Sequence, residues 1–556
     1  MKGVFKMPRI KRNIFQIIFF STLFFSTTLR SDSFPYKPPR EMYLVSGMSN
    51  LLHPVTTTNP EAQSFFNQGL TYKYAFNHDA SYWSFQKAAE LDPEMAMAQW
   101  GMALALGSNI NSPITPDRQK AAYEHIQKAI KLSDRITSNE KGYIQALARR
   151  YSNDAPPDLP KLESAYKNAM GQLVEIYRDD LDAATLYAES VLNLNPWHQW
   201  TQDGKPIGET LKAVELLESI LKRAPNHLGA NHYYIHTIEA SKHPERALMS
   251  ANRLIQLLPA SGHILHMPSH IYILVGDYRQ AAEVNEQAVE ADQEYIRQFG
   301  MKGTYPLHYM SHNYFFLARA YCLEGQFDPA LKTARNLQAF YVPHFERMPE
   351  LEEYAMAPQW VLMRFNCWKD VIDLKPFPDK MTLSNTMLYF AKAYAYASNR
   401  NPEEAEKYTK LFLEGKSNLS AEATMGYNRA RMIADIAEKQ LLAKLAYLDG
   451  KMVESVELLK KAVVLQDSLN YNEPPDWYYS IRESLGAVLL ANRKHQEAEN
   501  VFREDLEIHP RNGRSLFGLL TALKAQQKDS DAFWVEKEFE EAWQCSQASL
   551  TLESLF

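Results

Sequence analysis

The sequence contains little cysteine and no excess of positive charge. Its 556 residues include only three cysteines, Cys322, Cys367 and Cys545, which are far apart and odd in number, so no disulfide framework is predicted. The 60 lysines and arginines are outnumbered by 66 acidic residues, and this net charge of -6 argues against a nucleic acid partner. A phosphate-binding loop, a Gly-x-Ser-x-Gly elbow, a His-Glu-x-x-His motif and a dinucleotide fingerprint are also absent from the sequence. The sequence therefore gives no signature of nucleotide binding, serine hydrolysis or zinc proteolysis.

Only one long hydrophobic run occurs, at residues 14–29, and five basic residues precede it. A basic segment followed by a short apolar run is typical of a secretory signal peptide, and the run is short for a membrane span. No Ala-x-Ala triplet follows it, so residues 1–32 are predicted to be either a signal peptide or an uncleaved N-terminal anchor. We therefore expect an exported protein, periplasmic or secreted, that meets a membrane only through this segment.

Small and large residues recur along the rest of the chain at a fixed spacing. In the first copy the pattern is carried by Phe65, Gly69, Tyr72, Phe85, Ala88 and Pro93. Four clear copies and four weaker ones begin near Ala62, Leu228, Gly262, Tyr479, Glu94, Ser311, Thr386 and Ile436. This spacing is that of the 34-residue tetratricopeptide (TPR) repeat, in which small residues let paired helices approach and large ones fill the space between them.

The repeats predict an all-α fold, an α-solenoid of helix-turn-helix units that forms a superhelix with a concave groove. The superhelix is expected over residues 61–545, after a linker at 33–60 and before a C-terminal tail at 546–556. Within it, three loop insertions are expected near 107–117, 195–206 and 296–310. The second insertion carries Trp197 and Trp200, and such aromatic loops often cover a groove.

Several segments resemble those of a family of exported bacterial TPR repeat-containing proteins. The most specific segments are NHYYIHTIEAS (231–241) and GHILHMPSHIYILVGDY (262–278). The resemblance implies the solenoid fold and an envelope location, but it supplies no activity. One departure is Phe315 in HNYFF (312–316), where related proteins often have a second histidine.

Nine of the sixteen histidines lie between residues 227 and 312. In TPR arrays the first helix of each repeat lines the groove, and its inward positions in three successive repeats predict one cluster of His232, His236, Glu239, His263, His266, His270 and His312. His232 and His236 have the i, i+4 spacing by which one helix offers two imidazoles to a metal ion. Imidazoles with one carboxylate suit zinc, copper, iron or nickel rather than calcium. The alternative to a metal site is a polar peptide groove, in which the histidines hydrogen-bond a neighbour or a peptide carboxylate; a lone groove histidine would favour that alternative.

The positions of two of these histidines depend on where one helix begins. Pro268 lacks an N–H and would disturb a helix that starts at Gly262. The alternative is a helix that starts at Pro268 itself, which leaves His263 and His266 in the preceding loop. His308 is a weaker candidate, and His227 and His243 are interpreted as helix-end or surface groups.

Two classes of function are consistent with these features. The first is a module that binds a protein or peptide in the concave groove and carries a transition-metal site (zinc, copper or iron). The alternative is a metal-dependent enzyme whose active site lies in the groove. In either case Glu239 is predicted to act as a ligand or as a base.

Overall fold

The computed structural model describes residues 42–48 and 51–556, so the predicted signal peptide or anchor lies outside the described residues. The described part contains 24 α-helices and one short hairpin. The first twelve helices are α1 (Pro60–Tyr74), α2 (His78–Leu91), α3 (Ala96–Leu106), α4 (Pro116–Lys131), α5 (Ser138–Ala148), α6 (Leu159–Ile176), α7 (Leu181–Leu192), α8 (Thr210–Arg223), α9 (Leu228–Ile238), α10 (Leu248–Leu257), α11 (Gly262–Leu274) and α12 (Tyr278–Phe299).

The second half continues in the same way and includes the hairpin. Its elements are α13 (Ser311–Leu323), α14 (Phe327–Tyr341), α15 (Ala357–Arg364), α16 (Trp368–Asp373), α17 (Thr382–Ser398), α18 (Pro402–Asn418), β1 (Thr424–Met425), β2 (Asn428–Arg429), α19 (Ala430–Leu448), α20 (Met452–Asp467), α21 (Ile481–Ala491), α22 (His495–Ile508), α23 (Gly513–Ala525) and α24 (Asp529–Ala542). Short 3-10 or π turns are η1 (Ser133–Arg135), η2 (Pro244–Ala247), η3 (Tyr305–Met310), η4 (Val342–Arg347), η5 (Pro349–Met356) and η6 (Glu553–Leu555).

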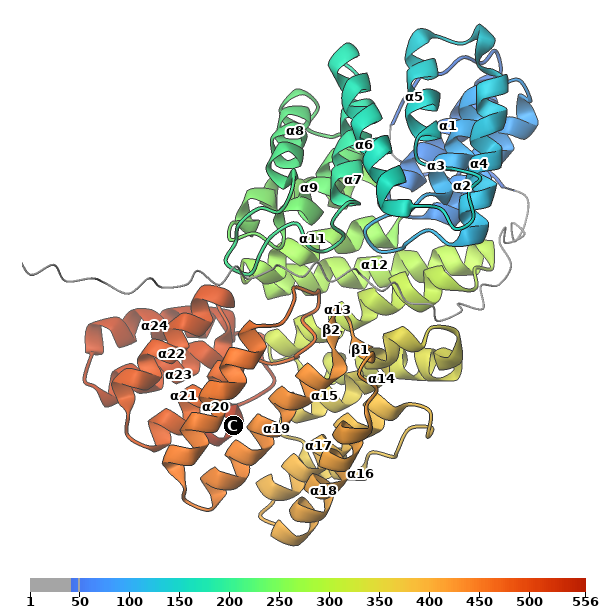
Figure 1. The fold of residues 1–556 in the computed structure, drawn as a ribbon. Helices are drawn as coiled ribbons and strands as arrows, with labels where there is room; N and C mark the ends of the chain where they lie inside the picture. The colour runs from blue at the N-terminus through green and yellow to red at the C-terminus, as the bar shows by residue number, and fades with distance from the viewer. Residues whose placement is uncertain (1–41, 49–50) are drawn as a thin grey trace, which may run out of the picture.

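Consecutive helices pack as pairs, α1 with α2 through α23 with α24, and each pair stacks on the next (Figure 1). This is the predicted all-α solenoid of TPR-type units, and the fold prediction is confirmed. Each of the eight predicted copies coincides with a helix pair. Four further pairs, α5/α6, α7/α8, α15/α16 and α23/α24, carry no pattern that the sequence analysis recognised.

The packing explains why the repeat needs small residues. A Cβ atom added at Gly69 or Gly101 would lie 2.8 or 2.3 Å from the Phe85 ring, which is wedged between helices α1 and α3. The same arrangement recurs near the C-terminus, where Gly486 and Gly518 contact the Phe502 ring from α21 and α23. One large aromatic residue in the second helix of a repeat therefore requires a glycine in the first helix of its own repeat and of the next.

The superhelix is tight enough for distant repeats to touch. The turn between α11 and α12 contacts the loop between α22 and α23: the Tyr278 hydroxyl donates a hydrogen bond to the Pro510 carbonyl at 2.8 Å. Gly276 in this turn has a φ of 81°, and a Cβ there would lie 2.3 Å from the Pro510 oxygen, so the contact requires glycine. Trp197 lies against Tyr427 of the β1–β2 hairpin, with ring centroids 5.5 Å apart. These contacts join repeats that are far apart in the chain.

The described part of the predicted linker and the predicted tail both pack on the solenoid. Thr56 donates hydrogen bonds to Glu140 of α5 from its backbone and its hydroxyl, each at 2.6 Å. At the other end, Lys444 of α19 donates to the Phe556 carbonyl at 2.7 Å. The predicted insertions at 107–117 and 195–206 fall in the connections after α3 and α7. The third, at 296–310, is mostly helical, because α12 extends to Phe299 and η3 leads directly into α13.

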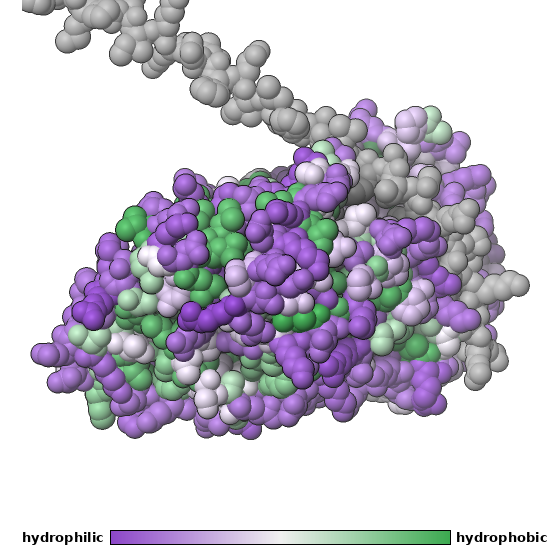
Figure 2. All heavy atoms as spheres, turned by 90° about the horizontal axis from the view of Figure 1, so that it is seen from below, coloured by the Kyte–Doolittle hydropathy of each residue, from purple (hydrophilic) through white to green (hydrophobic). Residues whose placement is uncertain are grey.

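The outer surface is mainly hydrophilic on the face that Figure 2 shows, with hydrophobic residues scattered among polar ones. Within residues 42–48 and 51–556, no helix combines the length and the apolar character that crossing a membrane requires.

Candidate metal centre

Three first helices of successive repeats, α9, α11 and α13, carry the predicted site residues. Helix α9 begins after His227, whose Nδ1 accepts a hydrogen bond from the Ala230 backbone N–H, so this histidine caps the helix. Helix α11 begins at Gly262 and continues through Pro268, so the alternative start at Pro268 is wrong. Gly262 is closely packed, because a Cβ there would lie 1.9 Å from Asp292 of α12.

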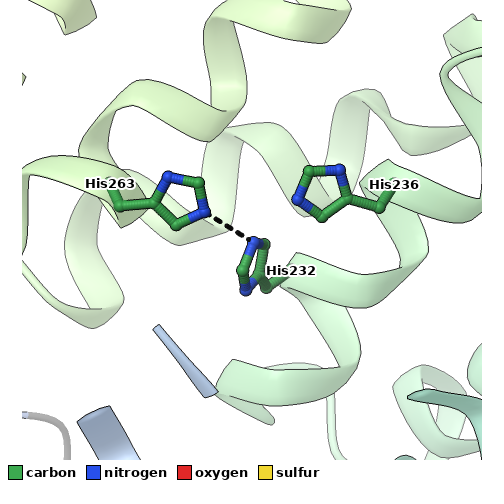
Figure 3. A group of neighbouring side chains, drawn as sticks. All are labelled: His232, His236 and His263. Atoms are coloured by element: carbon green, nitrogen blue, oxygen red, sulfur yellow. Dashed lines mark hydrogen bonds between the residues drawn. The ribbon is translucent and has the colours of Figure 1, made fainter. Parts of the chain in front are cut away.

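The six predicted histidines converge in two groups of three. The first triad is His232, His236 and His263, which point toward one another in Figure 3. The second triad is His266, His270 and His312. In each triad, one nitrogen from every ring lies within 4.8 Å of the other two. Each triad therefore has the composition of a three-histidine metal site.

Hydrogen bonds on the outer side of the rings orient the first triad. His232 Nδ1 lies 2.6 Å from the Tyr74 backbone carbonyl, and His236 Nδ1 lies 2.8 Å from Glu239 Oε1. Both partners are acceptors, so each Nδ1 carries the proton and each Nε2 presents a lone pair to the interior. His263 Nε2 lies 3.2 Å from His232 Nε2. His236 Nε2 and His263 Nδ1 have no hydrogen-bond partner among the described residues.

The second triad is oriented in the same way. His266 Nδ1 lies 2.6 Å from Asn285 Oδ1, and the Asn285 amide is itself fixed because its Nδ2 donates to the Ala281 carbonyl at 2.7 Å. His270 Nδ1 contacts Glu239 Oε2. The Nε2 atoms of His270 and His312 lie 2.8 and 3.0 Å from His266 Nε2. The Nε2 atoms of His270 and His312 therefore both lie close to His266 Nε2. A proton on His270 supplies a hydrogen-bond donor for only one of these two contacts.

Glu239 connects the two triads without belonging to either. Its two oxygens face the Nδ1 atoms of His236 and His270, on the side of each ring that points away from the other histidines. Burial raises the pKa of Glu239, but the two imidazoles more than offset this effect and lower the pKa to about 2. Glu239 is thus an ionised carboxylate that orients two of the candidate histidine ligands. Carboxylates commonly have this role around metal sites.

Burial keeps most of these imidazoles neutral, which is the form that binds metals. Desolvation lowers the pKa of His236, and it lowers the pKa values of His232, His263, His266 and His312 well below the usual range. His270 differs: burial lowers its pKa, but the charge and the hydrogen bond of Glu239 raise it by more.

The histidines, which are predicted to face the concave groove, lie buried inside the protein. Five of the six are no more than 3% exposed. Phe76, at the end of α1, stacks on His236 and His263, and Trp197 meets the His236 ring edge-on at 5.6 Å. The predicted aromatic loop thus does contact the histidines, and Trp200 anchors it by donating to the Thr237 carbonyl at 2.7 Å.

Some residues of the centre were not identified from the sequence. Tyr74 contributes only a backbone carbonyl, and Asn285 lies on a second helix of the repeat, which the groove pattern does not cover. Glu473 is buried close to the second triad, and burial raises its pKa to about 7 although the charge of His270 lowers it. Its Oε1 accepts a hydrogen bond from the Tyr471 hydroxyl at 2.6 Å, whereas its Oε2 has no partner among the described residues.

Two other features of the described residues have a different character. His53, Asp180 and Asp182 also lie within 4.8 Å of one another, but here the histidine faces a carboxylate, with His53 Nδ1 2.7 Å from Asp182 Oδ2. A cavity of about 590 Å³ opens between α14 and the segment after α16, and its lining includes Arg335, Gln359 and Asp370 but none of the six histidines.

Fold and site together define the class of this protein, a TPR-type α-solenoid with a buried histidine centre. No protein-family model matches the sequence, and no curated protein matches it. Among solved structures, it is similar to yeast Tom70 at 12% identity, with 87% of this chain and 93% of that chain covered and a TM-score of 0.28.

Two further solved structures show a comparable likeness. The Cut9–Hcn1 hetero-tetramer of APC/C matches at 11% identity over 89% of this chain and 75% of that chain, with a TM-score of 0.29. The human IFIT1 dimer with m7Gppp-AAAA matches at 12% identity over 88% and 96%, with a TM-score of 0.33. Similarities this low say nothing about the ligands of this chain, and its fold class rests on its own helix pairs.

Proposed function

We propose that this protein is an exported TPR solenoid that binds transition-metal ions at its buried histidine centre. The observation that supports this function is the inward orientation of four imidazoles: the Nδ1 atoms of His232, His236, His266 and His270 each face an acceptor, so their Nε2 lone pairs converge. Converging acceptors in a desolvated interior are unfavourable without a donor or a cation between them. Neutral imidazoles suit zinc, copper or iron.

Elemental analysis of the purified protein tests this proposal. The chain lacking residues 1–32 is stripped with a chelator, reloaded with zinc, copper or iron, and compared with a His232→Ala/His236→Ala variant that circular dichroism shows to be folded. Near-stoichiometric metal in the parent and reduced metal in the variant are expected. A folded parent that retains no metal under any loading condition rules the function out.

The exported location is part of the same proposal and rests on the basic and apolar N-terminal residues. Fractionation of cells that express the full gene, followed by N-terminal sequencing, tests it. We expect the protein outside the cytoplasm, with cleavage near residue 32 if the segment is a signal peptide and an intact N-terminus if it is an anchor. Recovery of the full-length chain in the cytoplasmic fraction contradicts export.

A metal-dependent enzyme is the second candidate, and Glu473 is the observation that favours it. Three imidazoles leave one position of a four-coordinate ion free, and a buried carboxyl with a pKa of about 7 that interacts electrostatically with His270 is suited to proton transfer. A screen of the loaded protein against chromogenic hydrolytic and oxidative substrates tests this candidate. Catalysis should be lost in a Glu473→Gln variant that retains its metal, and no turnover above that of the stripped protein contradicts it.

Binding of a protein or peptide, a usual role of helical solenoids, remains a proposal for the rest of the concave side. Side chains fill the region around the histidines, so such a ligand would dock elsewhere. The cavity beside Arg335 and Asp370 is large enough for a few side chains. Crosslinking in cells followed by mass spectrometry should recover a partner through α14, and a partner crosslinked only elsewhere excludes this cavity.

A further inference from the structure

The two triads have the same construction. His266 and His270 on α11 lie one repeat, 34 residues, after His232 and His236 on α9. In both triads the third histidine is the second residue of the next first helix: His263 in α11 and His312 in α13. The same three histidine positions therefore occur twice, in two successive repeats.

We propose that the centre is dinuclear, with one transition-metal ion in each triad and with Glu239 as a carboxylate shared between them. This inference rests on the proposed function and adds to it the number of ions and the partition of the ligands. Glu239 is a positioning residue in this arrangement. It holds His236 of one triad through Oε1 and His270 of the other through Oε2.

The spacing of the nitrogens favours two ions over one. With metal–nitrogen bonds of about 2.0–2.1 Å, two ligands of one tetrahedral ion lie ~3.3 Å apart. The His232–His263, His266–His270 and His266–His312 nitrogens are separated by 3.2, 2.8 and 3.0 Å, close to that value. The ring nitrogens form two compact groups of three and not one group of six, as a single octahedral ion would require.

The two sites are close enough to influence each other. Ring centroids across the boundary between the triads lie 5.9 Å apart for His236 and His270 and 6.2 Å apart for His263 and His266. A single carboxylate, Glu239, contacts both triads directly, so its charge helps to offset the charge of both ions. The donors are otherwise imidazoles, which bind a metal in their neutral form, suit zinc or copper and disfavour hard cations such as calcium or magnesium.

Metal stoichiometry in variants of the full chain tests the two-ion arrangement. His263→Leu removes a ligand from the first triad only, and His312→Leu removes one from the second only. Neither residue contacts Glu239. His243→Ala is the matched control, since this histidine is exposed on the surface and outside both triads. Each protein is stripped and titrated with zinc(II) or, under anaerobic conditions, copper(I), with a competing indicator and elemental analysis as readouts.

With at least one of the two metals, we expect two bound metal ions per chain in the parent and in His243→Ala. Each triad variant should bind one metal ion per chain. A parent that saturates at one equivalent, or a single triad substitution that abolishes all binding in a folded protein, overturns the dinuclear proposal and leaves the proposed function standing. A parent that binds neither metal overturns both.

X-ray absorption of the loaded parent provides a test without substitutions. The dinuclear arrangement predicts three imidazole nitrogens per ion at about 2.0 Å. Six nitrogens per ion contradict the dinuclear arrangement, and so does a carboxylate in the first coordination sphere of every ion. This readout does not depend on how well any variant folds.

Discussion

The protein contains two buried polar regions built from similar residues and arranged in opposite ways. In the α1–α7 network, cations face carboxylates: Lys73 Nζ lies 2.8 Å from Glu189 Oε1, and His53 lies beside Asp182. In the histidine centre, six imidazoles face one another, and the one carboxylate hydrogen-bonded to them among the described residues, Glu239, lies on their outer side. The first region supplies its own counter-charges, whereas the second leaves its inward lone pairs unmatched.

This difference separates a structural network from a ligand site. Removing one member of a satisfied buried pair leaves an uncompensated charge, so the stability of the α1–α7 network depends on each partner. Removing one imidazole from the metal-free centre takes away an unmatched acceptor, and the main loss is expected to be binding. Four predictions, ordered from the largest expected effect to the smallest, test this contrast.

The largest effect is expected for Lys73→Met, which leaves Glu189 buried without its cation. The side chains of this pair are 0% and 1% exposed, so the substitution is expected to cost about 3–5 kcal/mol of unfolding free energy. The double variant Lys73→Met/Glu189→Leu should recover much of that loss, with metal content unchanged in both. Chemical denaturation measures the effect, and a double variant no more stable than the single one would show that the pair is not the cause.

Metal addition should have the next largest effect, and only through the histidine centre. A ligand that binds the folded state alone stabilises it by about 2.7 kcal/mol at a free concentration one hundred times its Kd. Thermal unfolding of the stripped protein with and without zinc or copper should therefore show a higher midpoint with metal. The increase should persist in His53→Ala and become smaller in His266→Ala/His270→Ala, which keeps only the first triad. An increase of equal size in both variants would place metal binding elsewhere.

A smaller, pH-dependent effect is expected where residues 51–59 dock on α7. Burial lowers the pKa of His53, but its hydrogen bond to Asp182 and the charges of Asp182, Asp180 and Glu140 raise it above 6.5 overall. The stabilisation by His53 is thus fully present below pH 6.5 and is lost as the pH rises through the raised pKa.

Burial raises the pKa of Asp182, but the hydrogen bonds and charges of His53 and His227 lower it by more. Its contribution is lost only in strong acid. Hydrogen exchange of residues 51–59, corrected for intrinsic rates, should show protection that weakens above neutral pH in the parent but not in His53→Gln. The same loss in His53→Gln would assign the pH dependence to another group.

The smallest effect is expected for His263→Leu in the metal-free protein. This change removes an imidazole whose Nδ1 has no partner among the described residues and whose Nε2 faces another ring nitrogen. Replacing an unsatisfied polar group with an apolar one of similar size should change the unfolding free energy by no more than about 1 kcal/mol. Denaturation of the stripped protein measures this, and a loss as large as that of Lys73→Met would mean that His263 is a satisfied structural residue.

The sequence predicted the fold well where packing is local. Gly69 and Phe85, or Gly486 and Phe502, contact each other within one repeat, so their spacing along the chain reports the helix pair directly. The pair α15/α16 was missed because its helices have only 8 and 6 residues and follow irregular 3-10 segments. The start of α11 was left open because a proline inside a helix is penalised locally, whereas the helix begins at Gly262 in packing that leaves no room for a Cβ beside Asp292 of the next helix.

The sequence by itself determined which histidines meet, because the repeat period and the inward positions of each first helix fix which side chains share the interior. Only the tertiary structure decided how they meet. It divided six histidines into two triads, turned Glu239 outward as a bridge, and closed the centre with Phe76 and Trp197. The physical reason is the sequence distance over which each interaction acts. The positions of the ligands follow from periodicity within a helix. Their orientation and burial depend on long-range contacts such as the one between the Tyr74 carbonyl and His232, which are 158 positions apart in the chain.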